Sequence, residues 1–144
     1  MTVRYEWRGA FENVELERLH AEGFGRRVLE DADWVGQVER HSLGWVVARD
    51  TDGGGDGAGG DRAPLVGFVN IAWDGGVHAF VLDTLAAASH ARQGIGTHLV
   101  QLAVDGARDA GCEWLHVDFE DHLRSFYFEA CGFTPTPAGV IALQ

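Results

Sequence analysis

The amino-acid sequence predicts an α+β fold, a single domain over residues 1–144 in which helices flank one mixed, mostly antiparallel β-sheet. Three observations predict it. With 144 residues and 46% hydrophobic content, the chain fits one globular core. Three strand-like segments follow one another in the middle of the chain, and a glycine turn then joins a strand to an amphipathic helix. No internal repeat or linker divides the sequence.

Strands are predicted where polar and apolar residues alternate or where short apolar runs lie between turn residues. The predicted strands cover residues 2–8, 43–49, 65–73, 77–86, 114–119 and 139–143. The segment between the second and third strands, residues 50–63, holds six glycines and four aspartates and no large apolar side chain. It is predicted to be a flexible hairpin loop.

Helices are predicted where apolar residues recur at helical spacing. The predicted helices cover residues 12–24, 28–40, a run from the glycine turn to residue 110, and 122–131 with Asp121 as its N-cap. The resulting order is one strand, two helices, three strands, a helix, a strand, a helix and a strand. Three consecutive antiparallel strands followed by a strand–helix–strand crossover favour helices packed around one mixed sheet.

Composition excludes several classes of function. The formal net charge of −11 repels nucleic acid, so no nucleic-acid partner is expected. No apolar run of about 18 residues is present, which predicts no membrane association. The N-terminus lacks the apolar region of a secretory signal, and Cys112 and Cys131 are predicted to be free thiols, both as in a cytoplasmic protein. The seven histidines form no spaced ligand motif, so no metal site is expected.

The most informative segment is the turn at residues 90–98, which lies between a predicted strand and a predicted helix. Unpaired backbone N–H groups at a helix start, with the positive end of the helix dipole, suit a phosphate or pyrophosphate. Gly94 and Gly96 let the backbone approach an anion closely. A dinucleotide-binding fold would instead need repeated strand–helix units, and although Asp118 has a suitable offset, the order of elements is wrong.

The order of elements and the turn Arg92-Gln93-Gly94-Ile95-Gly96-Thr97 resemble the GCN5-related N-acetyltransferase (GNAT) superfamily. The helix running into Cys131-Gly132-Phe133 is similar to that family's closing Tyr-x-x-x-Gly-Phe motif. The resemblance implies an acetyltransferase that uses acetyl-CoA. It assigns the pyrophosphate to residues 92–97 and the pantetheine arm to the strand segment Thr84, Leu85 and Ala86.

Two positions depart from the family pattern. The first signature residue, usually Gln or Arg, is Ala91 here. The tyrosine that protonates the departing thiolate would fall on Phe128, and Tyr127 lies one residue early. Helical phase puts Tyr127 on the apolar stripe, which makes it the candidate general acid, while a core tyrosine with a satisfied hydroxyl is the structural alternative.

An acyl transfer to an amine also needs a base for the amine proton. Asp83 is the first candidate, because an acid within an apolar strand is costly unless it is paired or functional. Strand alternation predicts that Asp83 and Leu85 face away from Leu82 and Thr84. A structural role for Asp83 stays open, and His41, His78 and His116 are further candidate bases.

The acceptor is expected to be a primary amine of a small molecule or peptide. Trp34, Trp45 and Trp73 lie in the half of the chain that forms the acceptor site in this family, with core packing as the alternative role. Two other classes stay open: a CoA-binding sensor without strong catalysis, which Phe128 favours, and an interaction protein that binds no nucleotide. Members of the family commonly dimerise near the C-terminus, which leaves a homodimer open.

Overall fold

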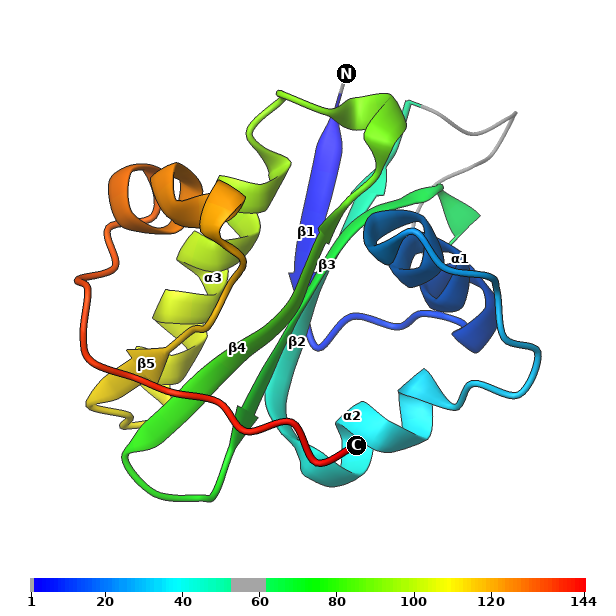
Figure 1. The fold of residues 1–144 in the computed structure, drawn as a ribbon. Coiled ribbons are helices and arrows are strands. Elements are labelled where there is room, and N and C mark those ends of the chain that lie inside the picture. The colour runs from blue at the N-terminus through cyan, green and yellow to red at the C-terminus, as the bar shows by residue number, and fades with distance from the viewer. Residues whose placement is uncertain (1, 53–61) are drawn as a thin grey trace.

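The computed structural model describes residues 2–52 and 62–144 and confirms the predicted α+β fold. Five strands form one sheet in sequence order: β1 (Val3–Trp7), β2 (Ser42–Asp50), β3 (Leu65–Trp73), β4 (His78–Ala86) and β5 (Trp114–His116). Neighbours from β1 to β4 pair antiparallel, and β5 pairs parallel to β4. The parallel pair is the predicted crossover: a helix follows β4 and precedes β5 in the sequence, and it covers one face of the sheet (Figure 1).

Helices cover both faces of the sheet. The helices α1 (Asn13–Phe24) and α2 (Trp34–His41) lie on one side, and α3 (Ile95–Asp109) lies on the other (Figure 1). The short helical segments η2 (Ala88–His90), η3 (Asp121–Leu123) and η4 (Ser125–Ala130) complete the described helices. In Figure 1, η3 and η4 lie on the α3 side, so the two lobes of helices face each other across β4.

The core is built from the inward stripes of the helices against the central strands. Leu16 of α1, Val38 of α2 and Leu99 of α3 are all buried in this core. The helix α3 packs very close to the sheet, since a Cβ at Gly67 of β3 would lie 2.8 Å from the Ile95 side chain. The centre of the sheet is therefore closely packed from both faces.

Two elements are shorter than predicted. The helix α2 begins at Trp34 and not at residue 28, because the backbone N–H of Leu29 donates to the Glu17 carboxylate at 2.7 Å and the preceding chain folds as a loop. The strand β5 ends at His116, because β4 and β5 separate beyond that point.

Two predictions for the C-terminal part are wrong. Residues 139–143 form no strand, and Val140, Ile141 and Leu143 are 86%, 83% and 93% exposed. Pro135 and Pro137 precede them, and a proline has no N–H for a β-ladder. Asp121 does not cap a helix, since the side chain of Arg124 donates to its carboxylate and the N-cap of η3 is Glu120.

The predicted loop at residues 50–63 lies mostly outside the described residues. At its two ends, Asp50 belongs to β2, and the Ala63 carbonyl accepts a hydrogen bond from the buried side chain of Arg49. Cys112 and Cys131 are both free, as predicted. Within residues 2–52 and 62–144, no helix has the length and apolar content to cross a membrane.

Candidate functional site

The strands β4 and β5 separate where the site begins. Their pairing covers only His78↔Trp114, Ala79↔Leu115 and Phe80↔His116. Beyond Phe80, no register pair among the described residues joins β4 to β5. The backbone of β4 from Leu82 to Ala86 therefore presents an open edge between the two lobes, and an extended ligand arm could pair with it.

A bulge in β4 lies on this open segment. The register with β3 shifts from Asn70↔Leu82 to Phe68↔Leu85, which sets Asp83 and Thr84 opposite the single residue Val69. Leu82 and Leu85 therefore share a face of the sheet, so the predicted placement of Leu82 is wrong. The rest of the predicted alternation is confirmed, because Asp83 and Leu85 face α1 while Thr84 faces η4. Asp83 has φ +53°, a left-handed conformation that costs a non-glycine residue about 1 kcal/mol or more.

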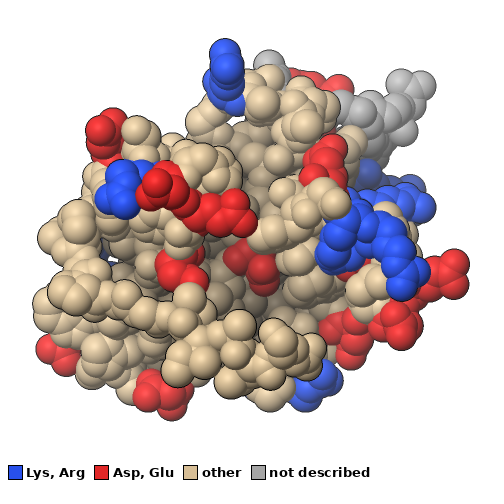
Figure 2. All heavy atoms as spheres, in the orientation of Figure 1, with Lys and Arg blue, Asp and Glu red and all other residues tan. Residues whose placement is uncertain are grey.

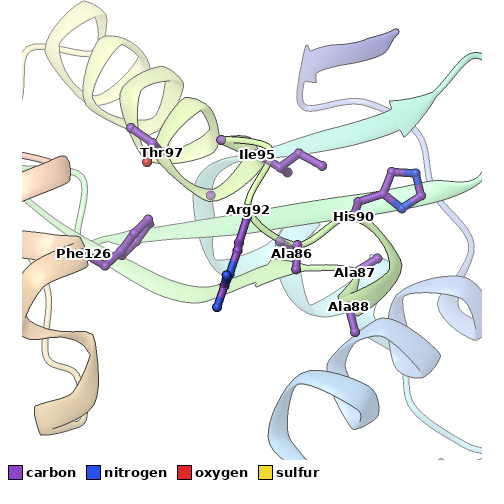
Figure 3. A pocket seen from close by; sticks show the side chains of 11 residues that line it. Ala86, Ala87, Ala88, His90, Arg92, Ile95, Thr97 and Phe126 are labelled. Atoms are coloured by element: carbon purple, nitrogen blue, oxygen red, sulfur yellow. The ribbon is translucent and has the colours of Figure 1, made fainter. Parts of the chain in front are cut away.

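The glycine turn forms an anion-binding helix start beside the end of β4. Gly94 is the N-cap of α3 with φ +79°, a conformation that favours glycine. The first helical hydrogen bond runs from the His98 N–H to the Gly94 carbonyl at 3.0 Å. The N–H groups of Ile95, Gly96 and Thr97 precede it and have no helical acceptor. They open onto a surface pocket of about 360 Å³ (Figure 3).

Six of the nine predicted cofactor residues line this pocket: Ala86, Arg92, Gly94, Ile95, Gly96 and Thr97. Thr84 and Leu85 precede it on β4, with Leu85 buried, and Gln93 is exposed outside the lining. Sequence reasoning missed Phe126, whose ring lies across from Gly96 so closely that a Cβ there would be 3.1 Å from it. Its contact across 30 residues of chain leaves no local signal in the sequence.

The basic side chains near the turn do not all gather at the pocket. His90 lines the pocket but bonds to the Asp50 carboxylate at 2.7 Å, and the His98 ring stacks on Tyr5 of β1 with centroids 3.9 Å apart. The Arg92 side chain extends from the turn alongside the pocket, between Phe126 on one side and Ala86 to Ala88 on the other (Figure 3). Positive charge at the pocket comes from Arg92 and the start of α3.

Tyr127 reaches β4 from η4. Its side chain is buried, and its hydroxyl donates to the Thr84 hydroxyl at 3.2 Å. The reason is the π-helical winding of residues 125–130, with a hydrogen bond from the Cys131 N–H to the Phe126 carbonyl. This winding accommodates one extra residue before Gly132, so the side chain of Tyr127 turns toward the sheet. Phe128 instead packs against Phe119 and under the Arg124 guanidinium.

Burial controls the protonation of Tyr127. Its ring packs between aromatic neighbours, with the Phe119 centroid at 4.8 Å and the Phe133 centroid at 5.8 Å. Desolvation raises the pKa of Tyr127, and this outweighs the hydrogen bond to Thr84, which lowers it. The phenol therefore keeps its proton at neutral pH and is available as a donor.

Asp83 faces the opposite lobe. Its carboxylate Oδ1 lies 3.2 Å from Nε2 of His20 on α1, and its side chain is 24% exposed. Of the three tryptophans, Trp45 is buried and donates to the Gly9 carbonyl, Trp73 packs against the core, and Trp34 lies beside the His20 ring. Of these three, Trp34 is thus the one that contacts His20, the partner of the candidate base Asp83.

The other candidate bases lie elsewhere. His78 and His116 bond to each other at 2.8 Å on the paired segment of β4 and β5, and His41 is exposed at the end of α2. Figure 2 shows acidic side chains in the hollow at the middle of this face, with the basic side chains at its margins. Histidine, cysteine and carboxylate groups do not gather in threes anywhere in the described parts of the chain.

Comparison with known proteins matches the chain to a family model. The model of the acetyltransferase (GNAT) family matches residues 5–133. None of the curated proteins searched matches the sequence significantly. Among solved structures, a GNAT-family acetyltransferase of Streptococcus pneumoniae aligns with a TM-score of 0.67 and 22% identity over 99% of this chain and 100% of that one.

Two further solved structures belong to acetyltransferases or complexes that are named with an amino sugar or aminoglycoside. Glucosamine-6-phosphate N-acetyltransferase of Arabidopsis thaliana aligns with a TM-score of 0.69 and 11% identity, over 96% of this chain and 97% of that one. The protein AAC(6')-Iy, in complex with a bisubstrate analogue of CoA and acetylneamine, aligns with a TM-score of 0.69 and 12% identity over 100% and 99% of the two chains. At these identities the structural likeness shows the shared fold.

Proposed function

Because this chain belongs to the acetyltransferase (GNAT) family, we propose that it transfers the acetyl group of acetyl-CoA to a primary amine of a small molecule or peptide. One observation carries the proposal. The bulge of β4 places a carboxylate, Asp83, and a hydroxyl bonded to a buried phenol, Thr84 with Tyr127, on the open strand edge just before the pocket begins at Ala86. A proton acceptor and a proton donor thus adjoin the open strand edge.

The residues around the pocket fit acetyl-CoA. The pyrophosphate would be held by the free N–H groups of residues 95–97 and by Arg92, and the pantetheine arm would follow the open edge at Thr84, Leu85 and Ala86. Gly96 leaves the space in front of Phe126 that a Cβ would fill. When bound, acetyl-CoA supplies a thioester, which a neutral amine can attack directly.

The two side chains have complementary roles in the proposed reaction. Asp83 accepts a proton from the acceptor ammonium, which leaves a nucleophilic amine. The amine nitrogen forms a bond to the acetyl carbon, the C–S bond breaks, and the departing thiolate takes the phenol proton of Tyr127. The nitrogen then loses its second proton, which returns to the Tyr127 phenolate, and the proton taken by Asp83 is released to solvent. The products are an amide and the free thiol of CoA, so no covalent enzyme intermediate is needed.

The charge of the site favours a cationic acceptor. The acidic side chains in the central hollow of Figure 2 and the formal net charge of −11 both attract an amine that arrives protonated. Trp34 and Phe24 flank His20 and provide aromatic faces for a cation or its apolar neighbour group.

The test is Tyr127→Phe in an amine-dependent assay of CoA release. We expect turnover to fall by about 10²-fold, the scale of a lost general acid, with acetyl-CoA binding unchanged. The only other tyrosine, Tyr5, stacks on His98, so Tyr5→Phe is the matched control and should keep full turnover. Full turnover in Tyr127→Phe would remove the proposed acid.

The same assay separates the alternative function. A CoA-binding sensor would bind acetyl-CoA but release no CoA with any amine. The feature that favoured a sensor was Phe128 at the acid position, and in the structure Tyr127 is the residue whose hydroxyl meets β4. We therefore propose the enzyme.

A further inference from the structure

A chain of polar contacts connects α1 to the bulge in β4, through residues to which sequence reasoning assigned no role. The Arg26 guanidinium donates twice to the Glu17 carboxylate, at 2.6 Å and 2.9 Å. Its Nη2 also lies 2.9 Å from Nδ1 of His20. On the far side of the ring, Nε2 lies 3.2 Å from Oδ1 of Asp83.

The contact with Arg26 fixes the tautomer of His20. A guanidinium can only donate hydrogen bonds, so Nδ1 of His20 must accept and carries no proton. The ring proton is then on Nε2, from which it is donated to Oδ1 of Asp83. The carboxylate thus receives one hydrogen bond from the protein, and no described residue donates to its other oxygen, Oδ2.

The network is anchored in the protein interior. The Glu17 side chain is 2% exposed and also accepts from the Leu29 N–H at 2.7 Å and from Trp34 Nε1 at 3.0 Å. The His20 ring is held between Phe24 and Trp34, with centroids 4.5 Å and 4.6 Å away. At the outer end, the side chains of His20 and Asp83 are 14% and 24% exposed, so the pair is sheltered but reachable from solvent.

The strained backbone of Asp83 is a second observation that points to a role for its carboxylate. Its left-handed backbone conformation is costly for an aspartate and would be relieved by glycine. The conformation turns the carboxylate toward His20 while the next residue, Thr84, meets Tyr127. A strained residue whose side chain is tied at one oxygen and open at the other is arranged to receive a donor from outside the chain.

We propose that His20 is a positioning residue: it holds the Asp83 carboxylate with Oδ2 open for the primary ammonium of the acceptor, and Arg26, anchored by Glu17, holds His20 in the required tautomer. This inference rests on the proposed function, because Asp83 is the base of that reaction. It names what sequence reasoning missed, since His20 and Asp83 are 63 residues apart.

The first test reads the network without acetyl-CoA or amine. In the ¹⁵N spectrum of the histidine-labelled protein at neutral pH, His20 should show a protonated Nε2 and an unprotonated Nδ1. In Arg26→Met, which removes the donor to Nδ1, the Nε2-protonated form should be less strongly preferred, because only the acceptor Asp83 then selects it. A His20 ring protonated on Nδ1 in the unsubstituted protein would overturn the proposal whatever the enzyme does.

The second test separates positioning from general damage. In His20→Ala, we expect kcat/KM for the amine to fall by about 10-fold or more, with KM for acetyl-CoA unchanged. In His20→Gln, whose amide N–H can replace Nε2–H, most of the loss should be recovered. His122, 70% exposed on η3, gives the matched control His122→Ala, which should behave as the unsubstituted protein.

The outcomes are distinct. Equal kcat/KM in His20→Ala and the unsubstituted enzyme would overturn the role of His20 and leave the proposed function intact. Equal losses in the Ala and Gln variants would also overturn it, because the hydrogen bond would not be the cause. If none of the amines tested makes the unsubstituted protein release CoA, the proposed function fails. This role of His20 then fails with it, even where the tautomer is as expected.

Discussion

The environment of the Glu17 carboxylate predicts how the free energy of unfolding depends on pH. The hydrogen bonds from Arg26 are the largest cause that lowers the pKa of Glu17 from its ordinary 4.5 to about 2, and those from Leu29 and Trp34 add to it against the opposing effect of burial. A carboxyl group with a lowered folded-state pKa stabilises the fold above its unfolded pKa. That contribution is lost as the pH falls from about 4.5 toward 2.

The magnitude follows from linkage. A carboxyl group that moves between these two pKa values contributes ~3 kcal/mol to the free energy of unfolding at neutral pH. The side chain of Arg26 is 30% exposed, so water screens the pair, and we discount the contribution to about 1.5 kcal/mol. Glu17→Gln removes the titrating group and keeps the shape of the side chain.

The assay is urea unfolding of the unsubstituted protein and Glu17→Gln at several pH values from 7 to 3. The gap between their free energies of unfolding should narrow by roughly 1 kcal/mol over this range. The exposed Glu39 provides the control Glu39→Gln. Its free energy of unfolding should differ from that of the unsubstituted protein by no more than about 0.5 kcal/mol at every pH. A gap for Glu17→Gln that does not change with pH would refute the reasoning.

Three further changes have expected outcomes. Gly96→Ala places a methyl group 3.1 Å from the Phe126 ring, so it should weaken acetyl-CoA binding, as measured by calorimetry; unchanged affinity would mean that the ligand does not use this space. Gly106→Ala brings a Cβ into overlap with the Trp7 ring and should lower the free energy of unfolding by about 1–3 kcal/mol in urea, whereas no loss would show that the ring can move at little cost. Deletion of residues 139–144 removes exposed residues, among them Val140, Ile141 and Leu143, so Tm should stay the same, and a fall of several degrees would show that the tail is buried in solution, for example in a homodimer.

Much of the fold could be predicted because local pattern and tertiary packing agree. The strand β1 is predicted from its alternation and β2 to β4 from their apolar runs, and these four strands pair as antiparallel neighbours. The helix α3 begins at the glycine turn as expected. The predicted strand at 139–143 failed because a strand pattern needs a partner edge, and the prolines before it cannot continue a ladder.

Part of the candidate site could likewise be predicted from the sequence, and part could not. The turn at residues 92–97 could be predicted, since a glycine turn and a helix start are adjacent in sequence. The π-helical winding that directs Tyr127 to Thr84 could not, because apolar periodicity does not distinguish one extra residue in a helical turn. The bulge at Asp83 could not be predicted from the sequence either, since the register of this segment is set by its pairing with β3.

Thermal unfolding with acetyl-CoA, CoA and NAD, each at millimolar concentration, tests the central claim most directly. A ligand at 100 times its Kd adds about 2.7 kcal/mol to the free energy of unfolding, which raises Tm by several degrees. We predict that acetyl-CoA and CoA raise Tm and that NAD does not. No shift with acetyl-CoA or CoA would contradict the assignment of the β4 edge and the start of α3 to this cosubstrate.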